Sequence, residues 1–204
     1  SWLEQYGLIK NKDGHAVIAN NIYKAVHVKA FFKEAKAPEE TSASEYILPG
    51  NRLDMESILL DFGQYIAQIG VRAFYEKDKP YEKTGQFLLT AWLYRFIKDG
   101  NGELRYELKS GLGIMDIMLS YKGMKYIIET KVNHQKKMTR ILNQGIDQVA
   151  KKYLSSESCR VGYLVIFDTK TPVGESGDPQ SYPAGDKGDK QVMVFIIGIG
   201  RPQF

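Results

Sequence analysis

Two uninterrupted apolar runs, residues 161–167 and 192–199, restrict this chain to few folds. A strand with one solvated face alternates apolar and polar residues, whereas an apolar run without alternation is typical of a strand covered on both faces. Both runs are much shorter than the roughly 20 residues that a membrane-spanning helix needs. We therefore expect them at the centre of a sheet that lies between layers of helices.

The segments before these runs complete an α/β pattern. Three stretches have apolar residues at helical spacing, and three short stretches read as a β-meander. The helical stretches begin after Asp54, after Pro80 and at residue 139, and the strands span residues 104–108, 114–120 and 125–132. The order α, α, βββ, α, β, β predicts a mixed central β-sheet flanked by helices. Residues 172–190 are rich in Gly, Pro and Asp, and we expect a mobile loop there.

The N-terminal part reads as a separate appendage. Residues 1–34 look like a helix, a hairpin and a helix, with Asp13-Gly14 as a strong hairpin turn signal. Residues 35–52 are polar and lack periodicity, so we predict a linker there and the main domain over residues 53–204. The chain reads as helical from its first residues, and we expect it to be a piece of a longer protein.

Three charged residues stand out inside the meander strands. Asp116 lies in one apolar strand, and Glu129 and Lys131 lie in the next. Side chains alternate along a strand, so Glu129 and Lys131 share a face, and a hairpin can bring Asp116 beside them. Two nearby carboxylates favour a shared cation, and oxygen ligands suit Mg²⁺ or Mn²⁺. Such an ion can polarise a phosphoryl oxygen and help to ionise water, with Lys131 orienting the water or stabilising the developing charge.

The acidic-x-Lys spacing by itself has little specificity. It occurs four times, beginning at Glu34, Glu107, Glu129 and Asp168, and only the copy at Glu129 lies inside an apolar strand whose predicted hairpin partner carries an acid. The alternative is an edge strand with a solvated face, on which a Glu/Lys pair contributes under about 1 kcal/mol.

The order of several blocks resembles a known family. The blocks are Tyr81-Glu-Lys-Thr-Gly-Gln-Phe, Leu104-Arg-Tyr-Glu-Leu, Gly111-Leu-Gly-Ile-Met-Asp116, Tyr126-Ile-Ile-Glu-Thr-Lys-Val132 and Gly162-Tyr-Leu-Val-Ile-Phe-Asp168. Together they resemble the DUF1703-like PD-(D/E)XK nuclease domain at the C-terminus of bacterial and archaeal AAA-like ATPases. Residues 1–34 are similar to the end of the winged-helix region that precedes that domain. The resemblance covers most of the chain outside residues 33–52 and 172–190.

The resemblance implies a restriction-endonuclease-like fold and assigns roles to particular residues. Asp116 and Glu129 match the metal-binding acids of the family, and Lys131 matches its catalytic lysine. Gln148 matches a glutamine that faces the site from the helix after the lysine strand, although an exposed helix glutamine is an equal alternative. Glu82 is the nearest match to an acid from the first core helix, and it can equally stabilise the first turn of that helix.

One departure from the family concerns phosphate contact. The turn before the aspartate usually reads Gly-x-Gly-Arg in that family, and here Ile114 occupies the arginine position. Other basic residues in and before the third helix could meet a nucleic-acid backbone, or could form a solvated helix face. These are Lys136, Lys137, Arg140, Lys151 and Lys152.

These observations lead to two functional hypotheses, and to a third possibility in which the charged residues serve packing alone and Asp116 points away from Glu129 to pair with a nearby lysine. The first is a Mg²⁺- or Mn²⁺-dependent nuclease domain that hydrolyses nucleic-acid phosphodiesters, with DNA as the expected partner and an ATPase domain upstream. The second is a catalytically inactive module of that ATPase, which binds nucleic acid, dimerises or regulates the ATPase. The net charge of +4 suits a polyanion but also many other proteins. A single cysteine and the lack of a signal peptide or membrane span favour the cytoplasm, and self-association stays open.

Several other activities are excluded by missing motifs. The chain has no Gly-x-x-x-x-Gly-Lys-Ser/Thr loop, so we expect no ATP hydrolysis by this chain itself. It has no Gly-x-Ser-x-Gly elbow, and its three histidines and Cys159 lack the spacing of a structural zinc site.

Overall fold

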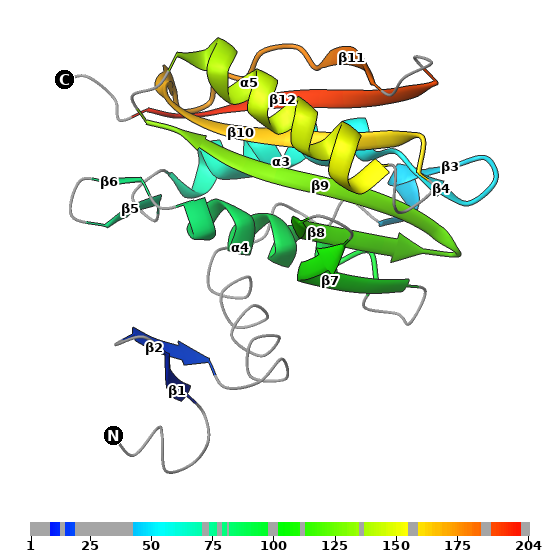
Figure 1. Ribbon diagram of the computed structural model, residues 1–204, viewed down its shortest axis with the longest axis horizontal. Helices are drawn as coiled ribbons and strands as arrows, with labels where there is room; N and C mark the ends of the chain where they lie inside the picture. Colours follow the sequence, from blue (N-terminus) through cyan, green and yellow to red (C-terminus); the bar gives the residue numbers. More distant parts are fainter. Residues whose placement is uncertain are drawn as a thin grey trace. The chain divides into compact units, whose positions relative to one another are not determined.

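The computed structural model divides the chain into two units, Ser1–Thr41 and Ser42–Phe204. It describes residues 9–12, 15–18, 43–70, 74–76, 79–80, 82–97, 102–110, 113–134, 137–154, 159–184 and 189–200. In the first unit, β1 (Ile9–Lys12) pairs antiparallel with β2 (His15–Ile18), which confirms the predicted hairpin (Figure 1). The helices predicted on either side lie outside the described residues.

The second unit is built on one six-stranded sheet with the order β11-β12-β10-β9-β8-β7 (Figure 1). Strand β10 is parallel to both β9 and β12, and the other neighbours are antiparallel. The strands are β7 (Gly102–Ser110), β8 (Gly113–Tyr121), β9 (Met124–Asn133), β10 (Val161–Pro172), β11 (Gln180–Ala184) and β12 (Lys190–Gly200). The mixed sheet confirms the predicted α/β class, with both apolar runs in interior strands.

A two-residue turn sets the register of the β8–β9 hairpin. Lys122 and Gly123 both have positive φ, at 45° and 83°. Two such residues match the twist of the flanking strands and let Tyr121 pair with Met124. The hairpin that the site requires is therefore fixed by local chemistry.

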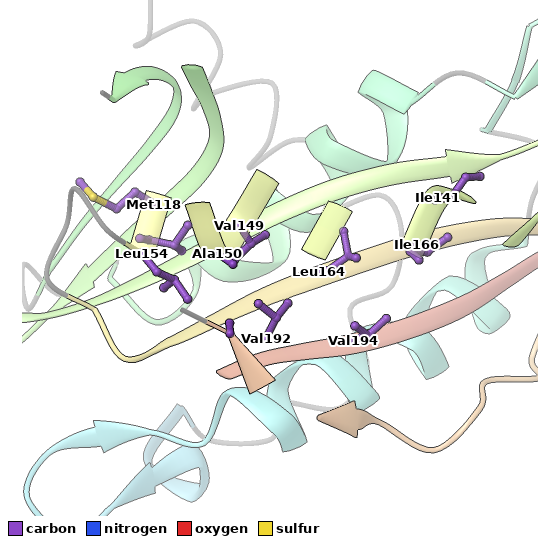
Figure 2. Packing of buried hydrophobic residues seen from close by; sticks show 11 residues of the cluster. Met118, Ile141, Val149, Ala150, Leu154, Leu164, Ile166, Val192 and Val194 are labelled. Carbon is purple, nitrogen blue, oxygen red and sulfur yellow. The ribbon is translucent and has the colours of Figure 1, made fainter. Parts of the chain in front are cut away.

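Helices cover both faces of this sheet. They are α3 (Met55–Ile69), α4 (Glu82–Tyr94) and α5 (Met138–Asp147), which continues as the π-helical segment η3 (Gln148–Leu154). Phe167 of β10 packs against Phe62 of α3, with ring centroids 6.3 Å apart. On the opposite face, Leu164 and Ile166 pack with α5 and η3 (Figure 2). Odd-numbered and even-numbered residues of β10 thus pack against two different layers of helices.

Two segments that we predicted to be irregular contain regular structure. Residues 43–53, largely inside the predicted linker, form a 3-10 turn (Ala43–Tyr46) and the hairpin of β3 (Ile47–Leu48) and β4 (Arg52–Leu53). A second small hairpin joins β5 (Tyr75–Glu76) and β6 (Lys79–Pro80). The expectation of a mobile loop over residues 172–190 was wrong in part, because β11 lies there and pairs with β12. An edge strand tolerates a proline such as Pro183, so the Pro-rich composition of this segment did not exclude a strand.

Candidate active site

Asp116 lies where strands β8 and β9 part. Their pairing runs from the turn to Ile117 and Ile128, and Asp116 is the next residue of β8. Its Oδ2 accepts hydrogen bonds from the backbone N–H and from Oγ1 of Thr130, both at 2.8 Å. The Asp116 carboxylate is therefore anchored on the residue between Glu129 and Lys131.

Glu129 is a fully buried carboxylate in an interior strand. It is 0% exposed, and Leu164 is its neighbour in register on β10. Lys131 donates from Nζ to Glu129 Oε1, and the lysine side chain is 24% exposed. A buried carboxylate is costly unless it is paired, so the lysine compensates a charge that the strand has taken out of water. The alternative of a solvated edge strand was wrong.

Helix α5 and segment η3 lie over the face that carries Glu129. Ile127, two residues earlier on the same face, belongs to the apolar cluster that Ile141 and Val149 join from the helix (Figure 2). Gly145 permits close contact, because a Cβ at this position would lie 2.5 Å from Leu164 Cδ2. Gln148 is half-buried and opens the π-helical segment, and its assignment to the site stays a prediction. Such segments often occur at functional sites.

Glu82 is the first residue of α4, and its side chain lies outside the described part of the structure. A Cβ at Gly85 of the same helix would meet the ring of Phe167 at 2.3 Å. Phe167 and Val132 are in register, on the face opposite Glu129. Helix α4 thus covers the other face of the sheet, and the assignment of Glu82 to the site stays a prediction.

The basic residues of the third helix are only partly described. Lys137 and Arg140 are exposed at the start of α5. Lys151 is also exposed and pairs with Asp147 at 3.1 Å, one helical turn earlier. Lys136 and the side chain of Lys152 lie outside the described residues. Of the described members of this group, Lys137 and Arg140 lie near the N-terminal end of α5.

Sequence reasoning missed three polar residues around this site. Thr130 holds Asp116, and Asn133 continues the row of Glu129 and Lys131 along β9. Asp168 of β10 is in register with Asn133 and accepts a 2.8 Å hydrogen bond from its Nδ2. Strand alternation from residue 129 could have predicted Asn133. We named Asp168 only as the start of another acidic-x-Lys tripeptide and as the last residue of a block in the family resemblance.

The donor set at the site is small and contains only oxygen. Within the described ranges, no three His, Cys, Asp or Glu side chains are grouped so that they could hold a metal ion. Asp116 and Glu129 are carboxylates on adjacent strands, and oxygen ligands of this kind suit Mg²⁺ or Mn²⁺ better than zinc. In the same described part of the chain, no helix has the length and apolar character to cross a membrane.

Comparison with known proteins gives one family and no named relative. A search among curated proteins found no match for this sequence. One family model, described as a domain of unknown function (DUF8371), matches residues 54–171. The match runs from the N-cap residue of α3 to the end of β10 and includes Asp116, Glu129 and Lys131. It covers more than half of the 204 residues, and the chain therefore belongs to the DUF8371 family.

Proposed function

We propose that this chain is a metal-dependent nuclease domain of the PD-(D/E)XK type that hydrolyses nucleic-acid phosphodiesters. The observation that supports it best is that Asp116 of β8 hydrogen-bonds Thr130, the residue that stands between Glu129 and Lys131 in the sequence of β9. Burial of Glu129 adds support, since a fully buried carboxylate is rare and this one is paired with the lysine that the proposal uses.

Each of the three residues has a distinct role in this proposal. Asp116 and Glu129 would hold Mg²⁺ or Mn²⁺, which supplies positive charge at a phosphoryl oxygen and lowers the pKa of water. Lys131 provides a fixed cation next to the reacting phosphate and can stabilise negative charge there or orient the attacking water. Gln148 would contact the same site from the helix that covers it.

Nucleic acid would approach from the exposed basic end of α5. Lys137 and Arg140 are both exposed there and can meet backbone phosphates without reading a base sequence. We propose DNA as the substrate. We also propose that an AAA-like ATPase domain lies upstream in the same cytoplasmic protein. Both proposals rest on the resemblance in sequence.

The test is a cleavage assay on plasmid and single-stranded DNA with Mg²⁺ or Mn²⁺. It compares the wild type with Asp116→Asn and Lys131→Ala, each of which should lower the cleavage rate by at least about 100-fold. Lys125→Ala is the matched control, because Lys125 lies on the same strand and the same face but at its opposite end. The control should keep wild-type activity.

Two outcomes would contradict the proposal. Equal cleavage by wild type, Asp116→Asn and Lys131→Ala would show that the site is elsewhere or that the activity is a contaminant. No cleavage by the wild type, combined with salt-dependent DNA binding that Lys137→Ala and Arg140→Ala weaken, would replace the nuclease by the inactive binding module.

A further inference from the structure

Strand β9 carries a row of three polar side chains on its α5 face. Glu129, Lys131 and Asn133 alternate along the strand, so all three point to the same side. Asn133 is 1% exposed, and its register partner on β10, Asp168, is 4% exposed. A buried Asn–Asp pair therefore lies at the end of the row, next to Lys131.

Asp168 fixes the orientation of the Asn133 amide. A carboxylate only accepts hydrogen bonds, so Asn133 must present its Nδ2 to Asp168 Oδ1, at 2.8 Å. Asp168 is itself held, since Thr171 Oγ1 donates to its Oδ2 at 2.7 Å and the backbone N–H of Lys170 to its Oδ1 at 3.3 Å. The amide therefore cannot turn over without losing a charge-assisted bond, and its oxygen must face away from Asp168.

The amide oxygen of Asn133 lacks a donor. Among the described residues, this Oδ1 is buried and accepts no hydrogen bond. A buried acceptor without a donor costs about 1–3 kcal/mol. An apolar residue at this position would avoid that cost. The presence of an oriented and buried acceptor beside the site therefore points to a donor that arrives in another state of the protein.

Among the described residues, Lys131 is the nearest ammonium donor on the same face of β9. It lies midway between two buried acceptors, with Glu129 two residues before it and Asn133 two residues after it, each about 7 Å away along the strand. Its ammonium sits on a flexible four-carbon stem and here bonds Glu129 Oε1. We propose that Asn133 Oδ1 is a second docking position for the Lys131 ammonium, which the lysine takes when a cation engages Glu129.

This inference rests on the proposed function and deepens it. If Glu129 gave its oxygens to a divalent ion, Lys131 would lose its bond to Glu129 Oε1, and at 24% exposure part of its side chain already reaches solvent. Asn133 would instead keep the ammonium in the row beside Glu129. Asn133 and Asp168 are positioning residues in this scheme, since neither touches substrate.

The test follows Lys131 itself, in the absence of nucleic acid. An amine-selective reagent labels the folded protein with and without Mg²⁺, and peptide mass spectrometry reports the labelling rate at Lys131. In the wild type, Mg²⁺ should leave this rate nearly unchanged, because the lysine passes from one buried acceptor to another. In Asn133→Leu, Mg²⁺ should raise it about tenfold, the factor expected for one lost hydrogen bond of ordinary strength.

Two further variants separate positioning from mere packing. The exchange Asn133→Asp with Asp168→Asn keeps the bond between β9 and β10 and an acceptor at position 133, and it should restore the wild-type response. Asp168→Asn alone lets the Asn133 amide turn over, so Mg²⁺ should expose Lys131 as in Asn133→Leu. Asp168→Asn replaces Asn133→Leu in the labelling experiment if Asn133→Leu does not fold.

Calorimetric titration of Mg²⁺ into the wild type and Glu129→Gln separates failure of the inference from failure of the proposed function. If the wild type binds Mg²⁺ through Glu129 but labelling at Lys131 responds equally in wild type, Asn133→Leu and Asp168→Asn, the second docking position is refuted and Asn133 has only a structural role. If the wild type binds no Mg²⁺, the proposed metal site fails, and this inference fails with it.

Discussion

The close packing of α5 on the sheet can be tested by adding one methyl group at Gly145. Alanine is the better helix former by about 1 kcal/mol, so helix propensity alone predicts that Gly145→Ala is stabilising. The tertiary structure predicts the opposite. The new Cβ would lie 2.5 Å from Cδ2 and 2.7 Å from Cδ1 of Leu164, which is 0% exposed and enclosed in the apolar cluster.

The expected magnitude follows from these two opposing effects. Overpacking of a dense core costs about 1–3 kcal/mol, and at these distances the upper part of that range applies. After the gain in helix propensity, Gly145→Ala should lower the free energy of unfolding by about 1–2 kcal/mol. Glu129 neighbours Leu164 in register, and Gln148 lies three residues after Gly145. On the proposed function, a displaced α5 should also slow DNA cleavage by the folded protein.

The assay is urea unfolding followed by circular dichroism, with Gly63→Ala as the matched control. Gly63 is a buried residue inside α3, but a Cβ there would meet only Ser176 Oγ at 3.1 Å and Ile197 Cγ1 at 3.8 Å. This substitution should be neutral or stabilising. In a Leu164→Ala background, Gly145→Ala should become stabilising too, because the obstructing methyl groups are gone. Stabilisation by Gly145→Ala in the wild type would refute the close contact between α5 and β10.

Three further predictions concern charge and capping. Lys131→Met should cost about 3 kcal/mol in urea unfolding by leaving the Glu129 carboxylate buried without its cation, and adding Glu129→Gln should recover most of that loss; no recovery would contradict the pairing. Burial raises the pKa of Tyr163 and Tyr126 above the usual value of 10.0, so they stay neutral in the folded chain while they ionise in the unfolded one. The urea midpoint should therefore hold below about pH 10 and fall above it, and a midpoint that rises there would refute their burial. Asp54→Ala removes the N-cap of α3 and should lower stability by about 1 kcal/mol in thermal unfolding, whereas an unchanged midpoint would mean that the cap contributes little.

Local chemistry explains why part of the site could be predicted. The turn at Lys122-Gly123 and the alternation of Glu129 and Lys131 are short-range features, and both follow from sequence once the strands are recognised. The anchoring of Asp116 could not be predicted in this way. Its partner Thr130 lies 14 residues away, and the contact exists only because β8 leaves β9 at that level.

The segments that we predicted to be irregular show more clearly what amino-acid composition cannot predict. Residues 180–184 contain Pro183 and lie among glycines, yet they form β11 because the free edge of β12 offers hydrogen-bonding groups that only the folded sheet presents. Asp168 was equally hidden, because its meaning depends on Asn133, which is 35 residues earlier in the chain.

The sequence by itself determined the α/β class and the hairpin that carries the three charged residues, since period and turn chemistry act over a few residues. The choice of Glu129-Thr-Lys131 among four similar tripeptides stays a prediction, because Glu107-Leu-Lys109 also lies within a strand, β7, and Asp168-Thr-Lys170 lies within β10. Only the tertiary structure decided that Glu129 is fully buried, that Thr130 holds Asp116, and that Asp168 turns the amide of Asn133. Burial and hydrogen-bond partners depend on which strands become neighbours, and that choice is made by the whole core rather than by any one segment.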